Sequence, residues 1–363
     1  MQFGILFISQ PNLDIDEYPH HSVHARVTGE VQLADELGYD VAWLAEHHFS
    51  NTYGIMPDVM TYGAYLAGLT KTIKIGTGVV VLPLNNPVRV VENMCFIDVL
   101  SGGRFVLGLG SGYREYEFQG LGVDFDTRRD IQIEGLELLM QLLTERRTSF
   151  EGKTCRSQID GDHELFPHPV QKPYPPLTMA VASEQSMAAA ARYGFGIMLS
   201  SIPSVEICAT QAGRYREMLS TTEEKYKGNR ARGDVILNRF VYVAETDEAA
   251  RKESEEGVLR HLSHYFGQGD YVNMVQKGAE GAADGLAYDK LLGDVVIHGS
   301  PDTVASMIEE MVEKTAMTGL ILHYPPYYGQ QQTIDMLRLF AKEVLPHVQD
   351  TIDLDEVRSY AAE

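Results

Sequence analysis

VHARVTGEVQLADELGYDVAWLAEHHF, residues 23–49, predicts a helix, a buried strand and a polar turn in succession. Gly38 ends the helix, whose apolar side chains share one face at spacings of three and four: Val23, Val27, Val31, Ala34 and Leu37. Val41–Ala45 is a continuous apolar run, which is typical of a strand buried on both faces of a parallel sheet. A helix that leads into such a strand is the unit from which α/β folds are built.

The same unit recurs along the chain. Segments with helical spacing separate eight short apolar runs, which we predict to be strands: Phe3–Ile8, Val41–Ala45, Ile73–Leu82, Arg104–Gly110, Leu177–Ala182, Gly196–Ser200, Val235–Ala244 and Gly319–Tyr324. A later helix is predicted to start at Ser300, a capping residue that is followed by proline and an acid. Eight strands that alternate with helices predict a (β/α)8 TIM barrel.

Two excursions interrupt the predicted barrel, one after strand 4 (about residues 147–176) and one after strand 7 (about residues 245–318). The first is rich in turn-forming residues and has no periodicity. No linker or repeat divides the sequence, so we expect residues 1–363 to form a single domain. Since barrels build their active sites at the C-terminal ends of the strands, we expect the two excursions to set the choice of substrate.

The composition argues against several classes of protein. With 51 acidic and 30 basic residues the formal net charge is −21, which disfavours binding to nucleic acid or to an anionic membrane surface. The three cysteines, Cys95, Cys155 and Cys208, are too widely spaced for a disulfide framework or a zinc ribbon. The sequence shows neither a secretory signal nor the roughly 20 apolar residues of a membrane span, so we expect a cytoplasmic protein.

The densest group of reactive side chains is AEHHF, directly after the second predicted strand. Side chains at this end of a barrel strand point into the mouth of the barrel, which makes Glu46, His47 and His48 candidates for acid–base chemistry. Adjacent residues of an extended chain face opposite sides, so we expect at most one of the two histidines to face the site. The alternative is that both are hydrogen-bonded loop histidines.

A glycine-rich turn follows the fourth strand in the stretch GRFVLGLGSGYREYEF. Gly108, Gly110 and Gly112 would let a planar ligand or another backbone approach closely, and Ser111 and Arg114 could contact an anion. The G-x-G-x-G spacing and the polar residues after it do not fit a dinucleotide-binding fingerprint. Packing within the barrel is the alternative reason for the glycines.

A third stretch, AVASEQSMAAAARYG, leads from the fifth strand into an Ala-rich helix. The free N–H groups of its first turn, with the hydroxyls of Ser183 and Ser186, predict a phosphate cradle, because a plain helix cap explains only one of the two serines. Arg128 and Arg129 could supply the cation, with surface solvation as the alternative. Histidine pairs with metal-like spacing, such as His261 and His264, have no carboxylate placed as in a known site, so no metal is predicted.

Seven stretches match one family of enzymes: MQFGILF, GYDVAWLAEHHF, IKIGTGVVVLPLNNPVRVVENM, LSGGRFVLGLGSGYREYEFQGLGVDF, AVASEQS, GSPDTV and LFAKEVLPHV. They make the chain similar to the luciferase-like flavin monooxygenase family. The match covers roughly residues 1–130, 175–200 and 295–348, while the two excursions match poorly. The resemblance implies a TIM barrel, in agreement with the strands predicted from periodicity.

For the site, the resemblance implies that His47 is catalytic beside Glu46 and that a cis peptide bond at Gly78–Val79 lies under the flavin ring. The flavin-binding positions that it implies are Gly78, Val79, Gly110, Ser111, Arg129, Ala182, Ser183, Glu184 and Ser186. Two family residues are replaced here, the reactive cysteine by Gly110 and a phosphate-contacting arginine by Ser111. These replacements argue against light emission from an aldehyde but not against flavin binding.

The activity implied is that of a two-component monooxygenase. A separate flavin reductase would supply reduced FMN (FMNH2), and one oxygen atom of O2 would be inserted into a small organic substrate. One alternative is an oxidoreductase that transfers hydride with the deazaflavin F420 on the same barrel. Another is a flavin-binding relative without catalytic activity.

Two further expectations concern assembly and movement. The segment PVRVVENMCFIDVLSGG has more apolar residues than one barrel needs, namely Val88, Val91, Met94, Cys95 and Val99. A surplus apolar face predicts a homodimer, and the family's barrels pair through helices beside the early strands. We also expect the Gly-rich segment 267–294 to order over bound flavin as a lid. The alternatives are that these apolar residues all belong to the core and that the loop is only solvated.

Overall fold

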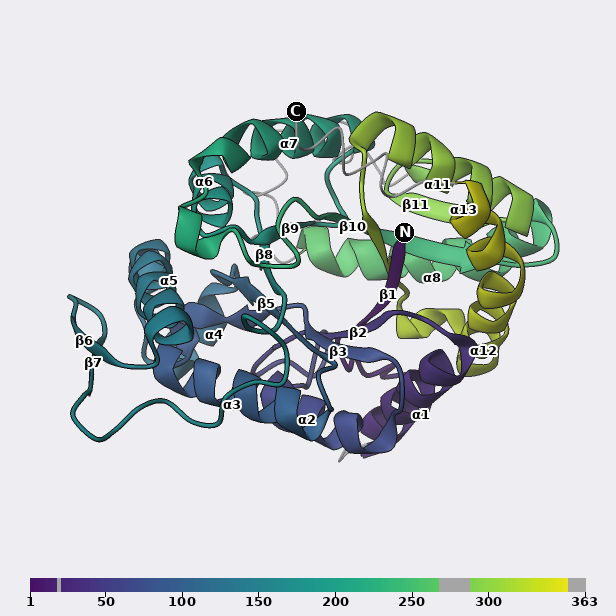
Figure 1. Ribbon diagram of the computed structural model, residues 1–363. Coiled ribbons are helices and arrows are strands. Elements are labelled where there is room, and N and C mark those ends of the chain that lie inside the picture. Colours follow the sequence, from purple (N-terminus) through teal and green to yellow (C-terminus); the bar gives the residue numbers. More distant parts are fainter. Residues whose placement is uncertain (18–20, 268–287, 352–363) are drawn as a thin grey trace.

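The computed structural model describes residues 1–17, 21–267 and 288–351. Its centre is a ring of parallel strands in which each strand pairs with the next and the last closes on the first (Figure 1). In order around the ring, the strands are β1 (Gln2–Phe7), β2 (Val41–Leu44), β3 (Lys74–Thr77), β5 (Phe105–Gly110), β8 (Leu177–Ala180), β9 (Gly196–Leu199), β10 (Val235–Val243) and β12 (Gly319–His323). The predicted (β/α)8 TIM barrel is confirmed, and each predicted strand overlaps one strand of the ring.

Helices surround the ring (Figure 1). They are α1 (His21–Leu37), α2 (Val59–Leu69), α3 (Pro87–Leu100), α4 (Glu115–Leu121), α5 (Arg128–Glu145), α6 (Glu184–Arg192), α7 (Val205–Met218), α8 (Asp247–Gly267), α10 (Tyr288–Leu291), α11 (Pro301–Thr315), α12 (Gln330–Leu339) and α13 (Leu345–Thr351), with a π-helical turn at Phe340–Val344. The predicted start at Ser300 is confirmed, because its hydroxyl accepts a hydrogen bond from the N–H of Thr303. None of the described helices has the length and apolar character needed to span a bilayer.

The third strand is divided in the structure. Residues 73–82, predicted as one strand, form β3, a break and β4 (Val80–Val81), and both pieces pair with β5. At the break, the Thr77 hydroxyl donates to the carbonyl of Gly108 and accepts from its N–H, both at 2.8 Å. This side chain thus replaces the ladder bonds that the backbone lacks there. The peptide bond between Gly78 and Val79 in the break is cis.

The first excursion joins the end of α5 to the start of β8. It contains an antiparallel hairpin that the sequence did not predict, β6 (Thr148–Glu151) and β7 (Arg156–Ile159). Gln171 donates from Nε2 to the carbonyl of Phe105, the first residue of β5, at 2.7 Å. The excursion therefore lies at the N-terminal ends of the strands, because α5 has already returned the chain across the barrel. We expected this excursion to lie at the C-terminal ends of the strands and to help set the choice of substrate there. That position is wrong.

The second excursion leaves the C-terminal end of β10, as predicted. It contains α8, the short strand β11 (Val296–Gly299) and α11. The sequence did not predict β11, which pairs with the last residues of β10 beyond the end of β12. Of the segment that we expected to act as a lid, residues 268–287 lie outside the described residues.

The inside of the barrel is filled by an apolar cluster of Val41, Trp43, Val106, Met198, Ile236 and Ile321. Trp43 is the largest of these side chains, and a Cβ atom added at Gly4 or Gly76 on the neighbouring strands would overlap its indole ring. The two glycines thus make room for Trp43. The indole fills the barrel from within, and the C-terminal ends of the strands form the mouth of the barrel above it.

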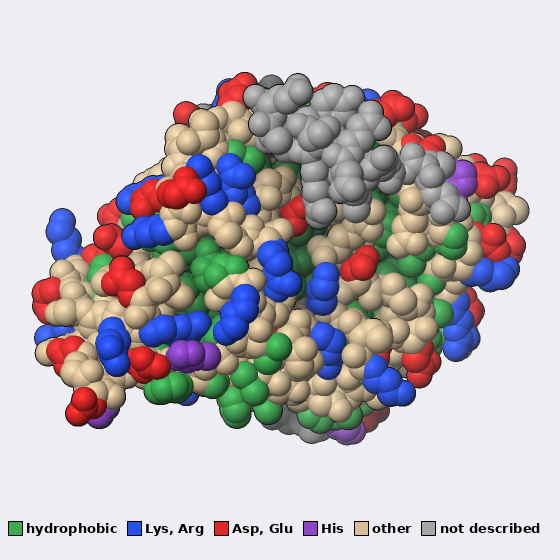
Figure 2. Space-filling view, in the orientation of Figure 1, with side chains coloured by type: hydrophobic (Ala, Val, Ile, Leu, Met, Phe, Trp, Pro, Cys, Tyr) green, Lys and Arg blue, Asp and Glu red, His purple; other side chains and the backbone are tan. Residues whose placement is uncertain are grey.

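The apolar residues predicted as a surplus face on α3 do not share one environment, since three are buried, Val88 is half-buried and Val99 is exposed. Val91, Met94 and Cys95 are fully buried, so they belong to the core and that part of the expectation is wrong. The exposed apolar residues of α3 and the adjacent α2 are Tyr65, Leu69, Phe96, Val99 and Leu100. Hydrophobic side chains also gather along the lower edge of Figure 2, where α2 and α3 lie in Figure 1.

Candidate active site

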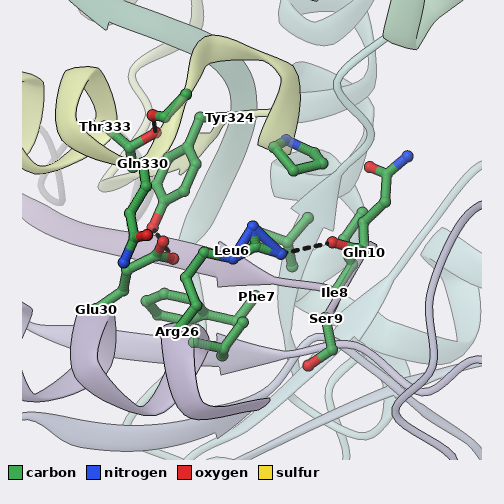
Figure 3. A pocket seen from close by; sticks show the side chains of 13 residues that line it. Leu6, Phe7, Ile8, Ser9, Gln10, Arg26, Glu30, Tyr324, Gln330 and Thr333 are labelled. Atoms are coloured by element: carbon green, nitrogen blue, oxygen red, sulfur yellow. Dashed lines mark hydrogen bonds between the residues drawn. The ribbon is translucent and has the colours of Figure 1, made fainter. Parts of the chain in front are cut away.

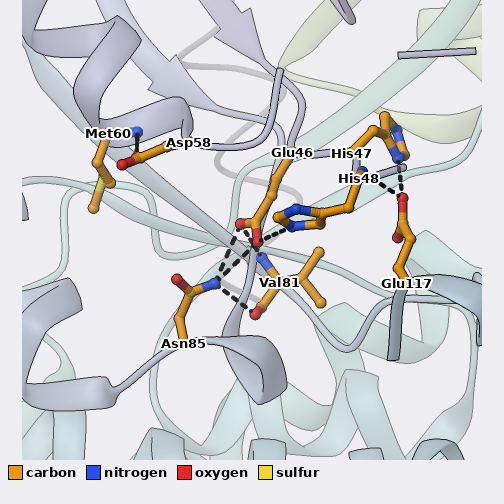
Figure 4. A network of polar contacts seen from close by, with 8 residues as sticks. All are labelled: Glu46, His47, His48, Asp58, Met60, Val81, Asn85 and Glu117. Carbon is orange, nitrogen blue, oxygen red and sulfur yellow. Dashed lines mark hydrogen bonds and ion pairs between the residues drawn. The ribbon is translucent and has the colours of Figure 1, made fainter. Parts of the chain in front are cut away.

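The turn after β2 is held by a buried carboxylate, that of Glu46 (Figure 4). Its Oε2 accepts from the N–H of Val81 at 3.0 Å, and its Oε1 lies 3.0 Å from Nε2 of His48. Asn85 donates from its amide to the same carboxylate at 3.1 Å. Glu46 therefore ties the polar turn after β2 to β4 and to the loop that follows it.

The backbone of the same turn contacts the cis peptide. The N–H of Gly78 donates to the carbonyl of Leu44 at 2.7 Å, and the N–H of Glu46 lies 3.4 Å from the carbonyl of Val79. The structure thus brings together the predicted catalytic residues and the predicted flavin-ring position, and the bond is cis as the resemblance implied.

His47 contacts a second carboxylate, Glu117, which comes from α4 after β5 (Figure 4). Oε1 of Glu117 lies 3.1 Å from Nδ1 of His47 and accepts from the N–H of His48 at 3.0 Å. A carboxylate oxygen that accepts from both groups assigns the proton of the neutral ring to Nδ1. Nε2 of His47 then keeps its lone pair. Sequence reasoning missed Glu117, although it lies in the YREYEF turn that was examined for an anion site.

The pKa values of the two adjacent histidines are shifted in opposite directions. Burial lowers the pKa of His47, and the hydrogen bond to Glu117 only partly offsets that effect. The hydrogen bond to Glu46 raises the pKa of His48 against a smaller desolvation effect. His47 is consequently neutral at pH 7 and can accept a proton, while His48 stabilises the turn. Both histidines are hydrogen-bonded, as the alternative reading of the sequence proposed, but in different surroundings.

Aromatic side chains surround His47. The ring of Tyr53 lies 4.6 Å from the His47 ring and that of Tyr113 lies 6.3 Å away. The guanidinium of Arg114 stacks over Tyr53 at 3.9 Å from the ring centre, and its charge lowers the pKa of His47 further. Neither tyrosine was singled out from the sequence, because their loops have no periodic signal that orients them.

The glycines after strand 4 have packing reasons. A Cβ atom at Gly108 would overlap the backbone of Thr77, and one at Gly110 would lie 2.6 Å from Cγ2 of Val79. Gly112 has a φ of +71°, and a Cβ atom there would lie 2.7 Å from the Phe118 ring. The packing alternative therefore explains these glycines without a ligand.

The turn before α6 is a capping box. Ser183 accepts from the N–H of Ser186, and Oγ of Ser186 accepts from the N–H groups of Ala182 and Ser183 at 3.2 and 3.1 Å. Both serines thus serve the helix cap, and the argument that a cap explains only one of them is wrong.

The two arginines at the start of α5 have different surroundings. Arg128 stacks on Phe125 at 3.6 Å and donates to its carbonyl, so it is a structural residue. Arg129 is exposed and makes no hydrogen bond or ion pair with any described residue. Gln132, on the same helix face as Arg129, contacts Met179 of β8. Through Gln132, the face of α5 that carries Arg129 adjoins β8, the strand that leads into the turn before α6.

A small cavity of about 30 Å³ lies outside the ring, between β1, α1 and the segment from Tyr324 to α12 (Figure 3). Glu30 in this cavity is buried and accepts a hydrogen bond from the Tyr324 hydroxyl at 3.1 Å. Burial raises the pKa of Glu30 to about 7, although Arg26 and Tyr324 act in the other direction. This buried carboxyl was not predicted from the sequence.

Residues 1–319 match the family model of luciferase-like monooxygenases. The chain belongs to this family. The alkanal monooxygenase alpha chain of the Kryptophanaron alfredi symbiont is 24% identical over 96% of this chain and 99% of its own length. An uncharacterized protein of Sinorhizobium fredii, y4vJ, is 37% identical over 170 residues, which span 47% of each chain.

Solved structures share the fold of this luciferase-like family member. The oxygenating constituent of 3,6-diketocamphane monooxygenase from Pseudomonas putida, in complex with FMN, superposes with a TM-score of 0.79 at 19% identity, over 96% of this chain and 98% of that one. The coenzyme F420-dependent tetrahydromethanopterin reductase of Methanopyrus kandleri gives a TM-score of 0.66 at 19% identity, over 96% and 99%. The structural neighbours therefore include flavin-dependent and F420-dependent enzymes.

Proposed function

We propose that this chain is the oxygenase component of a two-component monooxygenase that uses reduced FMN and O2 to insert one oxygen atom into a small organic substrate. A separate flavin reductase supplies the reduced flavin. The observation that carries the proposal is the backbone contact of the His47 turn with residues 78–79 at the barrel mouth, where the N–H of Glu46 lies 3.4 Å from the carbonyl of Val79. Family membership supports the reaction class.

The described residues fit a flavin with a single phosphate. The exposed Arg129 and the N-terminal turn of α6 offer a local positive site in a chain of net charge −21. Within that turn Ala182, Ser183 and Ser186 would contribute N–H and hydroxyl groups, whereas Glu184 can contribute only its N–H because its exposed carboxylate repels phosphate.

The flavin ring would lie against two turns, the one that follows β3 and the one that follows β5. Gly78 and Val79 at the cis bond, with Gly110 and Ser111 at the end of β5, are the residues proposed to contact it. Bound reduced FMN supplies the electrons that activate O2. A dry site is required for this chemistry, and the Tyr53 and Tyr113 rings beside His47 would supply apolar surface around it.

His47 is the proposed catalytic residue. Its Nε2 lone pair can accept or relay a proton at the reacting centre, while Glu117 holds Nδ1 and fixes the ring orientation. Glu46 acts indirectly, since its carboxylate is occupied by His48, Asn85 and Val81. Glu46 is therefore a positioning residue in this proposal.

The exposed apolar residues of α2 and α3 support a homodimer. Phe96 and Leu100 are 53% and 52% exposed on α3, beside the exposed Tyr65 and Leu69 of α2. A contiguous apolar face of this kind is stabilised when a second copy covers it.

Transfer of hydride with F420 is the second candidate, favoured by the structural likeness to F420-dependent enzymes. The two candidates differ in their need for oxygen. The test supplies reduced FMN under ¹⁸O2 with a panel of ketones, aldehydes and terpenes, and in parallel reduced F420 without oxygen. Product that carries one ¹⁸O atom supports the monooxygenase. Turnover with F420 alone contradicts it.

A further inference from the structure

His323 ends β12 at the mouth of the barrel. Two residues earlier on the same strand, Ile321 packs with Trp43 inside the barrel. Because side chains alternate along a strand, His323 faces the same way as Ile321, one layer closer to the mouth. It pairs in register with Phe240 of β10 and is 1% exposed.

The imidazole of His323 is buried without a polar partner among the described residues. Neither Nδ1 nor Nε2 makes a hydrogen bond to any residue that the structure describes. His298, at 3% exposure on β11, is the matched structural case: its Nδ1 lies 2.6 Å from the Ser254 hydroxyl and its Nε2 lies 2.8 Å from the Tyr328 hydroxyl. Proteins normally satisfy buried polar groups as they do at His298. The two ring nitrogens of His323, which are buried without a hydrogen-bond partner among the described residues, therefore point to a binding function.

Asn238 on the neighbouring strand β10 carries the second buried polar atom without a partner among the described residues. Its side chain lies on the same strand face as Ile236, which packs in the barrel interior. Its Oδ1 is buried and, among the described residues, has no hydrogen-bond partner. In the ring of eight strands, β12 lies opposite β5, whose end carries Gly110 and Ser111. The two open groups therefore face the residues proposed to hold the flavin.

The surroundings of His323 are aromatic and uncharged. The Phe240 ring stacks on it at 4.5 Å and the His261 ring meets it edge-on at 5.2 Å. The Tyr53 ring lies between His261 and His47, with its centre 6.3 Å from the His261 ring and 4.6 Å from the His47 ring. Burial lowers the pKa of His323 to about 3, which leaves a neutral ring with one donor and one acceptor. Such a ring suits an uncharged oxygen, since a buried carboxylate would need a cation beside it.

We propose that His323 and Asn238 form a subsite that hydrogen-bonds an uncharged carbonyl or hydroxyl oxygen of the organic substrate. The inference rests on the proposed function, because it assumes that flavin occupies the β3–β5–β8 side of the mouth. It makes neutral oxygenated molecules the substrate class, in preference to organic acids and to hydrocarbons without a polar group.

The first test follows the ring nitrogens of His323 by NMR in the full chain labelled with ¹⁵N-histidine, with 2-decanone and cyclohexanone as probes. The spectra of His323→Phe and His298→Phe assign the two signals. We expect both ketones to shift the His323 signals and to leave those of His298 unchanged. Decane, cyclohexane and decanoate should not shift them. Ketones that leave His323 unmoved overturn the proposal.

The second test compares affinities. His323→Phe keeps the aromatic stack on Phe240 and should weaken ketone binding about five- to tenfold, as expected for the loss of one or two hydrogen bonds, with partial recovery in His323→Gln. Its melting temperature should equal or exceed that of the wild type, whereas His298→Phe should melt lower. Unchanged ketone affinity overturns the proposal.

An FMN titration separates the possible ligands. We expect His323→Phe to bind FMN as the wild type does. FMN binding that is tenfold weaker in the variant would assign the open nitrogens to the flavin and overturn the substrate assignment. If wild-type protein binds no FMN, the proposed function fails, but the ketone shifts at His323 can still be scored.

Discussion

Glu117 and His47 are 70 residues apart in the chain, yet Oε1 of Glu117 lies 3.1 Å from Nδ1 of the His47 ring. The same oxygen accepts from the backbone of the next residue, so α4 and the turn after β2 form one unit. This contact orients the ring and directs its free nitrogen away from the carboxylate.

His47→Ala should keep the fold and the affinity for FMN but lower the rate of product formation by about 10²–10⁴-fold, the usual contribution of an acid–base group. More of the consumed flavin should end as hydrogen peroxide. Product and peroxide are measured together per flavin oxidised. His48→Ala is the control and should be milder, because it leaves the contact between His47 and Glu117 intact. Equal, near-wild-type coupling in both variants would contradict the assignment.

Glu117→Gln should lower the pKa of His47 further, because both the hydrogen bond and the charge of Glu117 raise it in the wild type. If neutral His47 is the active form, the acid limb of the pH–activity profile should move to lower pH. The maximal rate should fall, since the ring loses its fixed orientation. An acid limb that does not move, together with an unchanged His47 titration by NMR, would show that Glu117 does not control this histidine.

Arg129→Ala should weaken FMN binding roughly tenfold or more through the loss of a charge-assisted contact. Fluorescence titration at fixed ionic strength measures the effect. Arg128→Ala is the matched control: it removes the stack on Phe125 and should lower stability more than FMN affinity. FAD bound tenfold more tightly than FMN would contradict the single-phosphate site.

Glu30→Gln should change the pH dependence of stability. The folded-state pKa of Glu30 is about 7 against an ordinary value of 4.5, so the folded chain holds this proton more tightly. The wild type should therefore lose stability as pH rises from about 4.5 to 7, by up to about 3 kcal/mol. The variant keeps an acceptor for Tyr324 and avoids this loss. Urea unfolding measures the free energy of unfolding of Glu30→Gln relative to the wild type at pH 5 and pH 8. The variant should gain more stability at pH 8, and equal gains at the two pH values would refute the raised pKa of Glu30.

Phe96→Glu should convert a homodimer into a monomer. The substitution places a charge in the exposed apolar face of α2 and α3 without touching the core. Sedimentation at micromolar concentration should give a dimer for the wild type and a monomer for the variant. A monomeric wild type would remove the dimer proposal.

Short-range patterns were sufficient for the architecture. The eight ring strands and the start of α11 could be predicted because burial on both faces and helix capping leave a local record. The hairpin of β6 and β7 could not, since its strands TSFE and RSQI are partly exposed and contain no apolar run. The strand β11 was also missed, although all four of its residues are buried. The break at Gly78–Val79 came only from the family resemblance, because nothing in TGVVV distinguishes it from a continuous strand.

By itself, the sequence determined the barrel, the family and the turn that carries His47, because helix and strand periods and contiguous motifs are written in neighbouring residues. Only the tertiary structure decided that Glu117 orients that histidine and that the first excursion lies at the far end. It also decided that the His323 ring and Oδ1 of Asn238 face the mouth without a hydrogen-bond partner among the described residues. These relations depend on the closure of the ring, which sets residues from distant parts of the chain against one another. Local sequence patterns do not predict contacts between residues that are so far apart in the chain.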